Sequence, residues 1–266
     1  MSMFRRKKRS SEKRLDVDKI NKQRSRKSGV AGIVETLARN FQTLSYVLFI
    51  APLFFIYALC LTVALTPGAF LILSIWKLVS QESLAIQALS LALGFAGLVL
   101  TFILSLLIIV PIVNFPFLFI VKPYRGPWFS LDSLPWLYHN ALMYLVRYTV
   151  LDLVTPTPLS LAFLKAMGMK IGKHSMINTS NISDPCLIEI GDYVTIGGSV
   201  YMMAHYGMNG FLIIDRLKIR KKANVGLHAY LMGAVEIGEG AKVLPNTMVL
   251  PKTHVPADSS FSNYKM

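Results

Sequence analysis

The sequence is poor in cysteine and in acidic residues. It contains 2 cysteines, of which Cys60 lies in an apolar run and Cys186 in a repetitive segment. Two cysteines in such different surroundings do not suggest a disulfide framework. Neither has other metal-binding residues near it, and no clustered ligand spacing occurs elsewhere, so we expect no metal ion.

Hydrophobic residues and positive charge are both abundant. The 266 residues are 53% hydrophobic and carry a formal net charge of +14, and the mean hydropathy is +0.50. A soluble domain of this size rarely combines these values, whereas a membrane protein with a basic tail does. Residues 1–28 alone hold 12 Lys and Arg against 3 acidic residues.

We expect residues 1–31 to be a disordered, basic tail on the cytoplasmic side of a membrane. Such a tail fixes the topology of the protein or binds anionic lipid headgroups. Aromatic residues are not interleaved with the basic ones for base stacking, so membrane lipids are the expected partner and nucleic acid is not. A signal peptide does not fit, because the apolar block that follows is far longer than a signal-peptide core.

Residues 32–122 are predicted to be the transmembrane region. One apolar run covers residues 44–79 and a second covers residues 84–121. Each run is much longer than the roughly 20 residues that a bilayer core requires. The first run is interrupted at residues 66–68 and at Lys77, and the second at Pro111 and Pro116. We favour two long spans, although a tight hairpin within each run would give four.

Both counts are even, which leaves the two ends of the protein on the same side of the membrane. Lys122 and Arg125 join the basic tail in marking that side as cytoplasmic. The protein is therefore expected to be a multi-pass protein of the bacterial inner membrane whose C-terminal domain faces the cytoplasm. Residues 123–168 are predicted to be an amphipathic, helical juxtamembrane linker, lying in the interface or docked on the spans. A plain spacer helix is an equally good interpretation.

The C-terminal part of the sequence repeats with a period of six. Aliphatic residues recur at this spacing without a slip, and a small or β-branched residue follows each of them four positions later. A period of six fits neither a helix nor a simple strand, but it is typical of a parallel β-helix, in which each flat wall contributes one inward aliphatic residue. The aliphatic positions are Ile219, Val225, Leu231, Ile237, Val243, Val249 and Val255, and the small ones begin with Ala223, Ala229, Val235, Ala241 and Thr247.

The period extends back to residue 171 with two breaks. The first break lies at residues 183–188, and the second lies between residues 208 and 219. We expect residues 205–218 to be a loop that leaves a corner of the coil, which is where solenoids often bind ligands, and this loop contains His205. The earlier members of the series are Ile171, Ile177, Ile190, Ile196, Met202 and Met208.

Several stretches together resemble a known family. They are GMKIG at residues 168–172, NTSNISDPCLIEIGD at residues 178–192 and VYMMAH at residues 200–205. They are similar to the hexapeptide-repeat acyltransferases, and among these to the membrane-tethered, transferase-like C-terminal domains of poly-lysine-synthetase-type non-ribosomal peptide synthetases. YRGPW at residues 124–128 and TPTP at residues 155–158 resemble the juxtamembrane linker of that subgroup. The resemblance covers about residues 122–258.

The resemblance implies a left-handed parallel β-helix over residues 169–260, and a homotrimer with active sites between neighbouring subunits. It also implies transfer of an acyl group from a thioester, usually acetyl-coenzyme A, to a hydroxyl or an amine. In such families one histidine near the protruding loop is the general base, and His205 occupies the matching position. Asp184 matches an acidic position of the subgroup and could orient His205 or bind an amine acceptor. A turn before Pro185 is the simpler interpretation of Asp184.

Further candidates follow from the donor and the acceptor. The phosphates of coenzyme A need cations, and Lys252 lies where related enzymes often have a basic residue near the cofactor. Small residues and backbone groups could line the groove for the pantetheine arm. The donor-site candidates are Lys252, Lys221, Lys222, Gly233 and Leu227, and the acceptor-site candidates are Asn178, Ser199 and Tyr206.

Three functions remain open at this point. The first is a membrane-bound acyltransferase that acts on a lipid-linked saccharide, an amine or a peptide. The second is an amide-bond-forming transferase that uses an aminoacyl or acyl carrier thioester, and the third is a non-catalytic, trimeric membrane scaffold. Residues 244–247 are LPNT, where many relatives have a turn rich in glycine and small residues, and this departure leaves the donor open.

Overall fold

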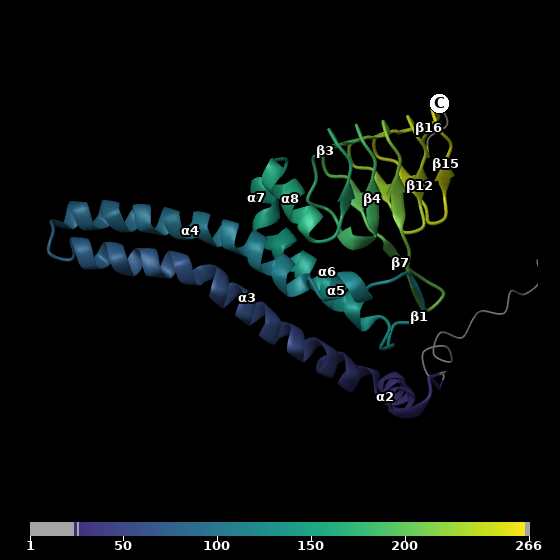
Figure 1. Ribbon diagram of the computed structural model, residues 1–266, viewed down its shortest axis with the longest axis horizontal. Helices are drawn as coiled ribbons and strands as arrows, with labels where there is room; N and C mark the ends of the chain where they lie inside the picture. The colour runs from purple at the N-terminus through teal and green to yellow at the C-terminus, as the bar shows by residue number, and fades with distance from the viewer. Residues whose placement is uncertain (1–23, 26, 264–266) are drawn as a thin grey trace, which may run out of the picture.

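The computed structural model describes residues 24, 25 and 27–263. Two long helices run side by side away from a β-solenoid, and a group of shorter helices lies between the helix pair and the solenoid (Figure 1). The predicted basic tail falls for the most part outside the described residues.

The apolar region forms α2 (Gly29–Asn40), α3 (Gln42–Val79) and α4 (Leu84–Asn114). In the described part of the chain, α3 and α4 are the two helices that are long and apolar enough to cross a membrane. The first apolar run therefore forms one continuous helix, whereas the second forms α4 and, after Pro116, the short helix α5 (Phe117–Ile120). Neither run folds into a hairpin of two long helices.

The expected break at residues 66–68 lies inside α3 and does not interrupt it. Pro67 removes one backbone hydrogen bond, but Gly68 beside it packs closely on α4, because a Cβ at this glycine would lie 2.7 Å from Leu98 Cα. Small residues that allow two helix backbones to approach stabilise helix pairs in membranes. The proline is therefore accommodated at a point of tight helix packing.

The segment predicted as a linker is docked on both of its neighbours. Its central helix α6 packs against α3 and α4, and it buries Trp136, His139 and Leu142. It is therefore not a free spacer helix. The elements of this segment are β1 (Tyr124–Pro127), α6 (Leu134–Val146), the π-helical turn η1 (Arg147–Leu151), α7 (Asp152–Val154) and α8 (Pro158–Ala166).

The C-terminal part is a coil whose chain visits three parallel sheets in rotation. The first wall is β2 (Lys170–Ile171), β4 (Ile188–Ile190), β9 (Leu217–Ile219), β12 (Glu236–Ile237) and β15 (His254–Val255). The second wall is β3 (Met176–Ile177), β5 (Thr195–Ile196), β10 (Asn224–Val225), β13 (Lys242–Val243) and β16 (Ser260–Phe261). The third wall is β6 (Tyr201–Met202), β11 (Tyr230–Leu231) and β14 (Met248–Val249). The parallel three-walled coil is confirmed, and its left-handedness stays a prediction.

The period of six in the sequence arises from this three-walled coil. The seven aliphatic residues from Ile219 to Val255 are at most 2% exposed, and equivalent residues such as Val225 and Val243 are direct neighbours in a ladder. The stacked coils share one continuous apolar interior. Burial of each aliphatic side chain in it contributes about 1.5–3 kcal/mol. That interior continues into α6 and α4.

The corners of the coil repeat as well. From residue 222 to residue 258, every sixth residue has a left-handed backbone with φ between +53° and +65°, and within this series only Gly240 is a glycine. Lys222 and Lys252 are members of the series. Both lysines therefore occupy sharp corners, and their side chains are exposed outside the coil.

Both breaks in the period contain regular structure. At the first, Ile182 bridges to Met202 of the third wall, and the 3₁₀ turn η2 (Pro185–Leu187) follows. The second break, expected as a loop, is a hairpin of β7 (His205–Met208) and β8 (Phe211–Ile214), which β1 extends to an antiparallel sheet. The expectation that Met208 lies on a wall is wrong, because it pairs with Phe211 in the hairpin and is 43% exposed.

Candidate active site

His205 stands where the hairpin leaves the corner between the third and the first wall. Its side chain is 19% exposed, and its Nδ1 lies 2.6 Å from Asp184 Oδ2. The Trp136 ring meets the imidazole edge-on, with ring centroids 4.9 Å apart and an angle of 64° between the planes. The ring is thus held from two sides, while Nε2 has no hydrogen-bond partner among the described residues.

Asp184 is fully buried at the start of η2 and has a left-handed backbone with φ of +59°. Its Oδ2 also accepts the amide N–H of Ala204 at 2.9 Å, and its Oδ1 accepts the Nε1–H of Trp136 at 2.6 Å. A buried carboxylate with a partner on each oxygen has a fixed orientation. Both interpretations of Asp184 hold geometrically, because it makes the turn before Pro185 and it binds His205.

The linker fixes the same part of the first coil at other points. Arg147 donates from Nη2 to Asn181 Oδ1 at 2.6 Å, and the Ser183 hydroxyl donates to the Tyr144 hydroxyl at 3.1 Å. These contacts were not foreseen, since residues 123–168 were expected to lie in the interface or to dock on the spans, and no contact with the coil was predicted. The available signal was chemical: the N–H of a buried tryptophan needs an acceptor.

The pKa values of the two histidines near Asp184 shift in opposite directions, although Asp184 raises both. Burial lowers the pKa of His205, but the hydrogen bond and the charge of Asp184 raise it more, so that the pKa lies above its ordinary value. At His139 of α6, burial lowers the pKa to about 4 against the effect of Asp184. His205 is therefore the imidazole of this cluster that can exchange a proton near neutral pH.

The arrangement can remove a proton from a nucleophile. A neutral imidazole that donates from Nδ1 to a carboxylate presents an unprotonated Nε2, which is the state that a general base requires.

Solved structures with a similar fold include a hexapeptide-repeat-containing acetyltransferase and a serine acetyltransferase. One from Vibrio cholerae is 17% identical, with 49% of this chain and 89% of that chain covered and a TM-score of 0.40. A second structure of the Vibrio cholerae protein, complexed with acetyl-coenzyme A, is 21% identical, with 41% of this chain and 76% of that chain covered and a TM-score of 0.35. The serine acetyltransferase of Neisseria gonorrhoeae in complex with serine is 18% identical over 48% and 53%, with a TM-score of 0.29. No protein-family model and no curated protein matches the sequence.

Gly233 and Lys252 share the corner of His205. A Cβ at Gly233 would lie 2.9 Å from the Ala204 carbonyl oxygen and 3.3 Å from the His205 nitrogen, so a glycine is needed where the next coil passes His205. Lys252 lines a pocket of about 290 Å³ together with Tyr206. Tyr206 adjoins His205 in sequence, but the pleat of β7 turns it to the opposite face of the hairpin. Its buried hydroxyl has no partner among the described residues.

The acceptor-site candidates Asn178 and Ser199 lie at another corner, between the second and the third wall, together with Leu227. A Cβ at Gly198 would lie 3.1 Å from Leu227 Cδ1 and 3.6 Å from Asn178 Nδ2. Within one chain, the coil separates this corner from His205.

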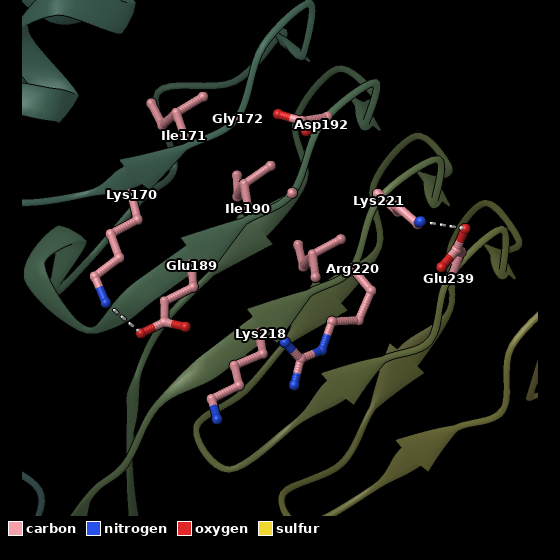
Figure 2. A pocket seen from close by; sticks show the side chains of 12 residues that line it. Lys170, Ile171, Gly172, Glu189, Ile190, Asp192, Lys218, Arg220, Lys221 and Glu239 are labelled. Carbon is pink, nitrogen blue, oxygen red and sulfur yellow. Dashed lines mark hydrogen bonds and ion pairs between the residues drawn. The ribbon is translucent and has the colours of Figure 1, made fainter.

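Lys221 and Lys222 occupy the remaining corner, between the first and the second wall. Lys221 lines a groove of about 700 Å³, shown in Figure 2. Its ammonium group lies 3.2 Å from Glu239, and across the groove Lys170 pairs with Glu189 at 2.9 Å (Figure 2). One chain therefore does not bring Lys221 or Lys222 to His205.

No group of three or more His, Cys, Asp or Glu could hold a metal ion within residues 24, 25 and 27–263. Cys60 and Cys186 are free thiols.

Proposed function

We propose that the protein is a membrane-bound acyltransferase that moves an acyl group, with acetyl as the first candidate, from a thioester to a hydroxyl or an amine. The observation that carries the proposal is the 2.6 Å contact between Asp184 and His205, at the point where the hairpin leaves the coil. The resemblance of residues 122–258 to hexapeptide-repeat acyltransferases supports the same reaction and a left-handed coil.

The proposed step uses His205 as the general base. As the acceptor oxygen or nitrogen attacks the thioester carbonyl carbon, its proton passes to Nε2 of His205. The new bond to the acyl carbon forms, the carbon–sulfur bond breaks, and the leaving thiolate takes a proton from the imidazolium. Asp184 keeps Nδ1 protonated and stabilises the positive ring between these two transfers.

The position of His205 beside α6 favours an acceptor held at the membrane. The imidazole contacts Trp136 of α6, and α6 packs against α3 and α4. A lipid-linked saccharide, a membrane-bound amine or a peptide would then meet the site at high effective concentration, because enzyme and acceptor share one surface.

We also propose that three copies assemble into a homotrimer. Lys221, Lys222 and Leu227, suggested for the donor, lie at corners away from His205, and a neighbouring copy would bring such a corner to the base. Leu227 is 49% exposed, and Met248 on the third wall is 42% exposed. Exposed apolar side chains of this kind fit an interface between copies.

The reaction is tested with the full-length protein in detergent or nanodiscs. Acetyl-coenzyme A is added with a panel of alcohols, amines and lipid-linked saccharides, and released thiol is measured. We expect thiol release that depends on one class of acceptor. Transfer only from an aminoacyl or acyl carrier thioester would establish the amide-bond-forming alternative. The scaffold alternative would follow if no thioester reacts and His205→Ala leaves both the oligomer and the cellular output unchanged.

The membrane arrangement is tested with topology reporters. A reporter inserted at Glu82, in the turn between α3 and α4, should be active outside the cytoplasm, and reporters at Lys122 and at the C-terminus should be active inside. These expectations follow if α3 and α4 each cross once and the basic residues stay on the cytoplasmic side. A C-terminal reporter that is active outside would contradict the proposed orientation.

A further inference from the structure

The linker helix α6 supplies one hydrogen bond to the carboxylate that binds His205. Trp136 Nε1 lies 2.6 Å from Asp184 Oδ1, whereas Asp184 Oδ2 binds His205 Nδ1 and the Ala204 amide. Trp136 is 7% exposed and Asp184 is fully buried, so water does not compete for this hydrogen bond. The two carboxylate oxygens therefore have separate tasks, one toward the linker and one toward the hairpin.

The same indole contacts the imidazole. Its ring meets His205 edge-on at a centroid distance of 4.9 Å. One side chain thus limits both the rotation of the Asp184 carboxylate and the tilt of the His205 ring. Among the described residues, Trp136 is the partner of Asp184 Oδ1.

We infer that Trp136 is a positioning residue of the candidate site, whose indole N–H fixes the Asp184 carboxylate so that His205 keeps its proton on Nδ1 and presents Nε2 to the acceptor. This inference rests on the proposed function. Trp136 lies on α6, which packs against α3 and α4. The helical region would therefore contribute to the geometry of the site as well as anchor the protein.

The indole N–H should affect the basicity of His205 as well as its position. A donor on Oδ1 draws negative charge away from Oδ2. Without this donor, Asp184 would stabilise the protonated imidazole more strongly, and the pKa of His205 should rise. The neutral base would then be scarcer near pH 7, and the carboxylate would be free to rotate.

Other ionisable groups near Asp184 and His205 do not contribute to the expected shift in the pKa of His205. Burial lowers the pKa of His139 on α6 to about 4, and burial raises the pKa of Cys186 in η2 to about 12. Both groups therefore stay neutral around pH 7. Arg147 of η1 remains bound to Asn181, and the Tyr144 hydroxyl remains bound to Ser183.

The test compares Trp136→Phe with Trp128→Phe in the full-length protein. Trp128 belongs to the same segment, is 44% exposed, and its indole has no hydrogen-bond partner among the described residues, so it is a matched control. We expect Trp136→Phe to lower kcat on the high-pH plateau by at least about tenfold, the factor for one lost hydrogen bond to a charged group. KM should change less, and Trp128→Phe should change kcat by less than about twofold.

A titration of ¹⁵N-labelled histidine gives a second result that does not depend on the acceptor. The chain has 5 histidines, and the His205 signals are identified by their loss in His205→Ala. We expect neutral His205 to carry its proton on Nδ1, and we expect its pKa to rise in Trp136→Phe but not in Trp128→Phe.

A double-mutant cycle separates positioning from packing. In an Asp184→Asn background, Trp136→Phe should cost less than about twofold, because the carboxylate that the indole orients is absent. If Trp136→Phe does not fold, 3-benzothienylalanine at position 136 keeps the shape of the ring and lacks the N–H. This variant then takes the place of Trp136→Phe in each measurement.

An unchanged kcat together with an unchanged pKa of His205 would overturn the inference. Equal losses from Trp136→Phe in the wild-type and Asp184→Asn backgrounds would also overturn it, because they would show a packing effect. Full activity of His205→Ala would overturn the proposed function instead, and the titration would still report whether Trp136 acts on His205.

Discussion

His205→Ala is expected to lower kcat/KM for acyl transfer by about 10²–10⁴-fold, the usual contribution of a positioned general base. The variant removes the only group of the Asp184–Trp136 cluster that exchanges a proton near neutral pH, since burial keeps the neighbouring His139 neutral by lowering its pKa to about 4. The loss should appear in kcat more than in KM, because the proton moves only as the new bond forms. Thiol release with the acceptor class found active is the measurement.

The pH dependence of the wild-type enzyme should identify the same residue. His205 works as a base only when it is neutral, so kcat/KM should fall as the pH drops through its pKa. Asp184 raises that pKa above the ordinary value, so the acidic limb should lie above about pH 6.5. In His205→Ala this limb should disappear.

The matched control for His205→Ala is His254→Ala. His254 lies on the first wall with its side chain 65% exposed, and its removal should leave kcat/KM within about twofold. Equal activity of His205→Ala and wild type would exclude His205 as the base. If His205→Ala disrupts the oligomer, the larger polar variant His205→Gln takes its place in the measurement.

The coil could be predicted from the sequence because its energetics depend on single positions. Each wall has room for one inward side chain, so Leu231 and Val249 must both be aliphatic, and the resulting period has no other common explanation. The hairpin was harder to foresee. Its strand β8 pairs with β1, which lies more than eighty residues earlier in the chain (Tyr124 opposite Ile214), and no local pattern encodes such a long-range antiparallel ladder.

The candidate site was predictable in part for a similar reason. His205 and Asp184 both lie at breaks in the period, and breaks in a solenoid are visible in the sequence. Trp136 could not be found in this way, because its partner is set by how α6 docks on the coil. Tyr206 shows the opposite limit, since adjacency in sequence suggested a shared site while the alternation of a strand turned it away from His205.

Asp184→Asn is expected to lower kcat by about 10²–10⁴-fold while the coil remains folded. The amide keeps the size of the carboxylate, and asparagine tolerates the left-handed backbone at this position. However, the amide nitrogen is a donor, so next to His205 it favours the tautomer that carries its proton on Nε2. Nε2 of His205 would then carry a proton and could not accept the proton of the attacking hydroxyl or amine.

The wild-type pH profile and its change in Asp184→Asn distinguish this mechanism from a general loss of structure. With the carboxylate gone, burial is the remaining influence on His205, and its pKa should fall below about 6.5. The acidic limb should therefore move to lower pH, opposite to the shift expected for Trp136→Phe, even as the plateau rate falls.

The stability of Asp184→Asn should decrease by about 1–3 kcal/mol, because the amide cannot accept all the buried donors that now meet the carboxylate. Thermal unfolding in detergent measures this change, with Asp192→Asn as the control, since that exposed carboxylate accepts a backbone N–H of Lys173 at a different corner. Normal kcat in Asp184→Asn at any pH would show that His205 does not need the carboxylate. A limb that moves to higher pH would show that the charge of Asp184 is not what raises the pKa of His205.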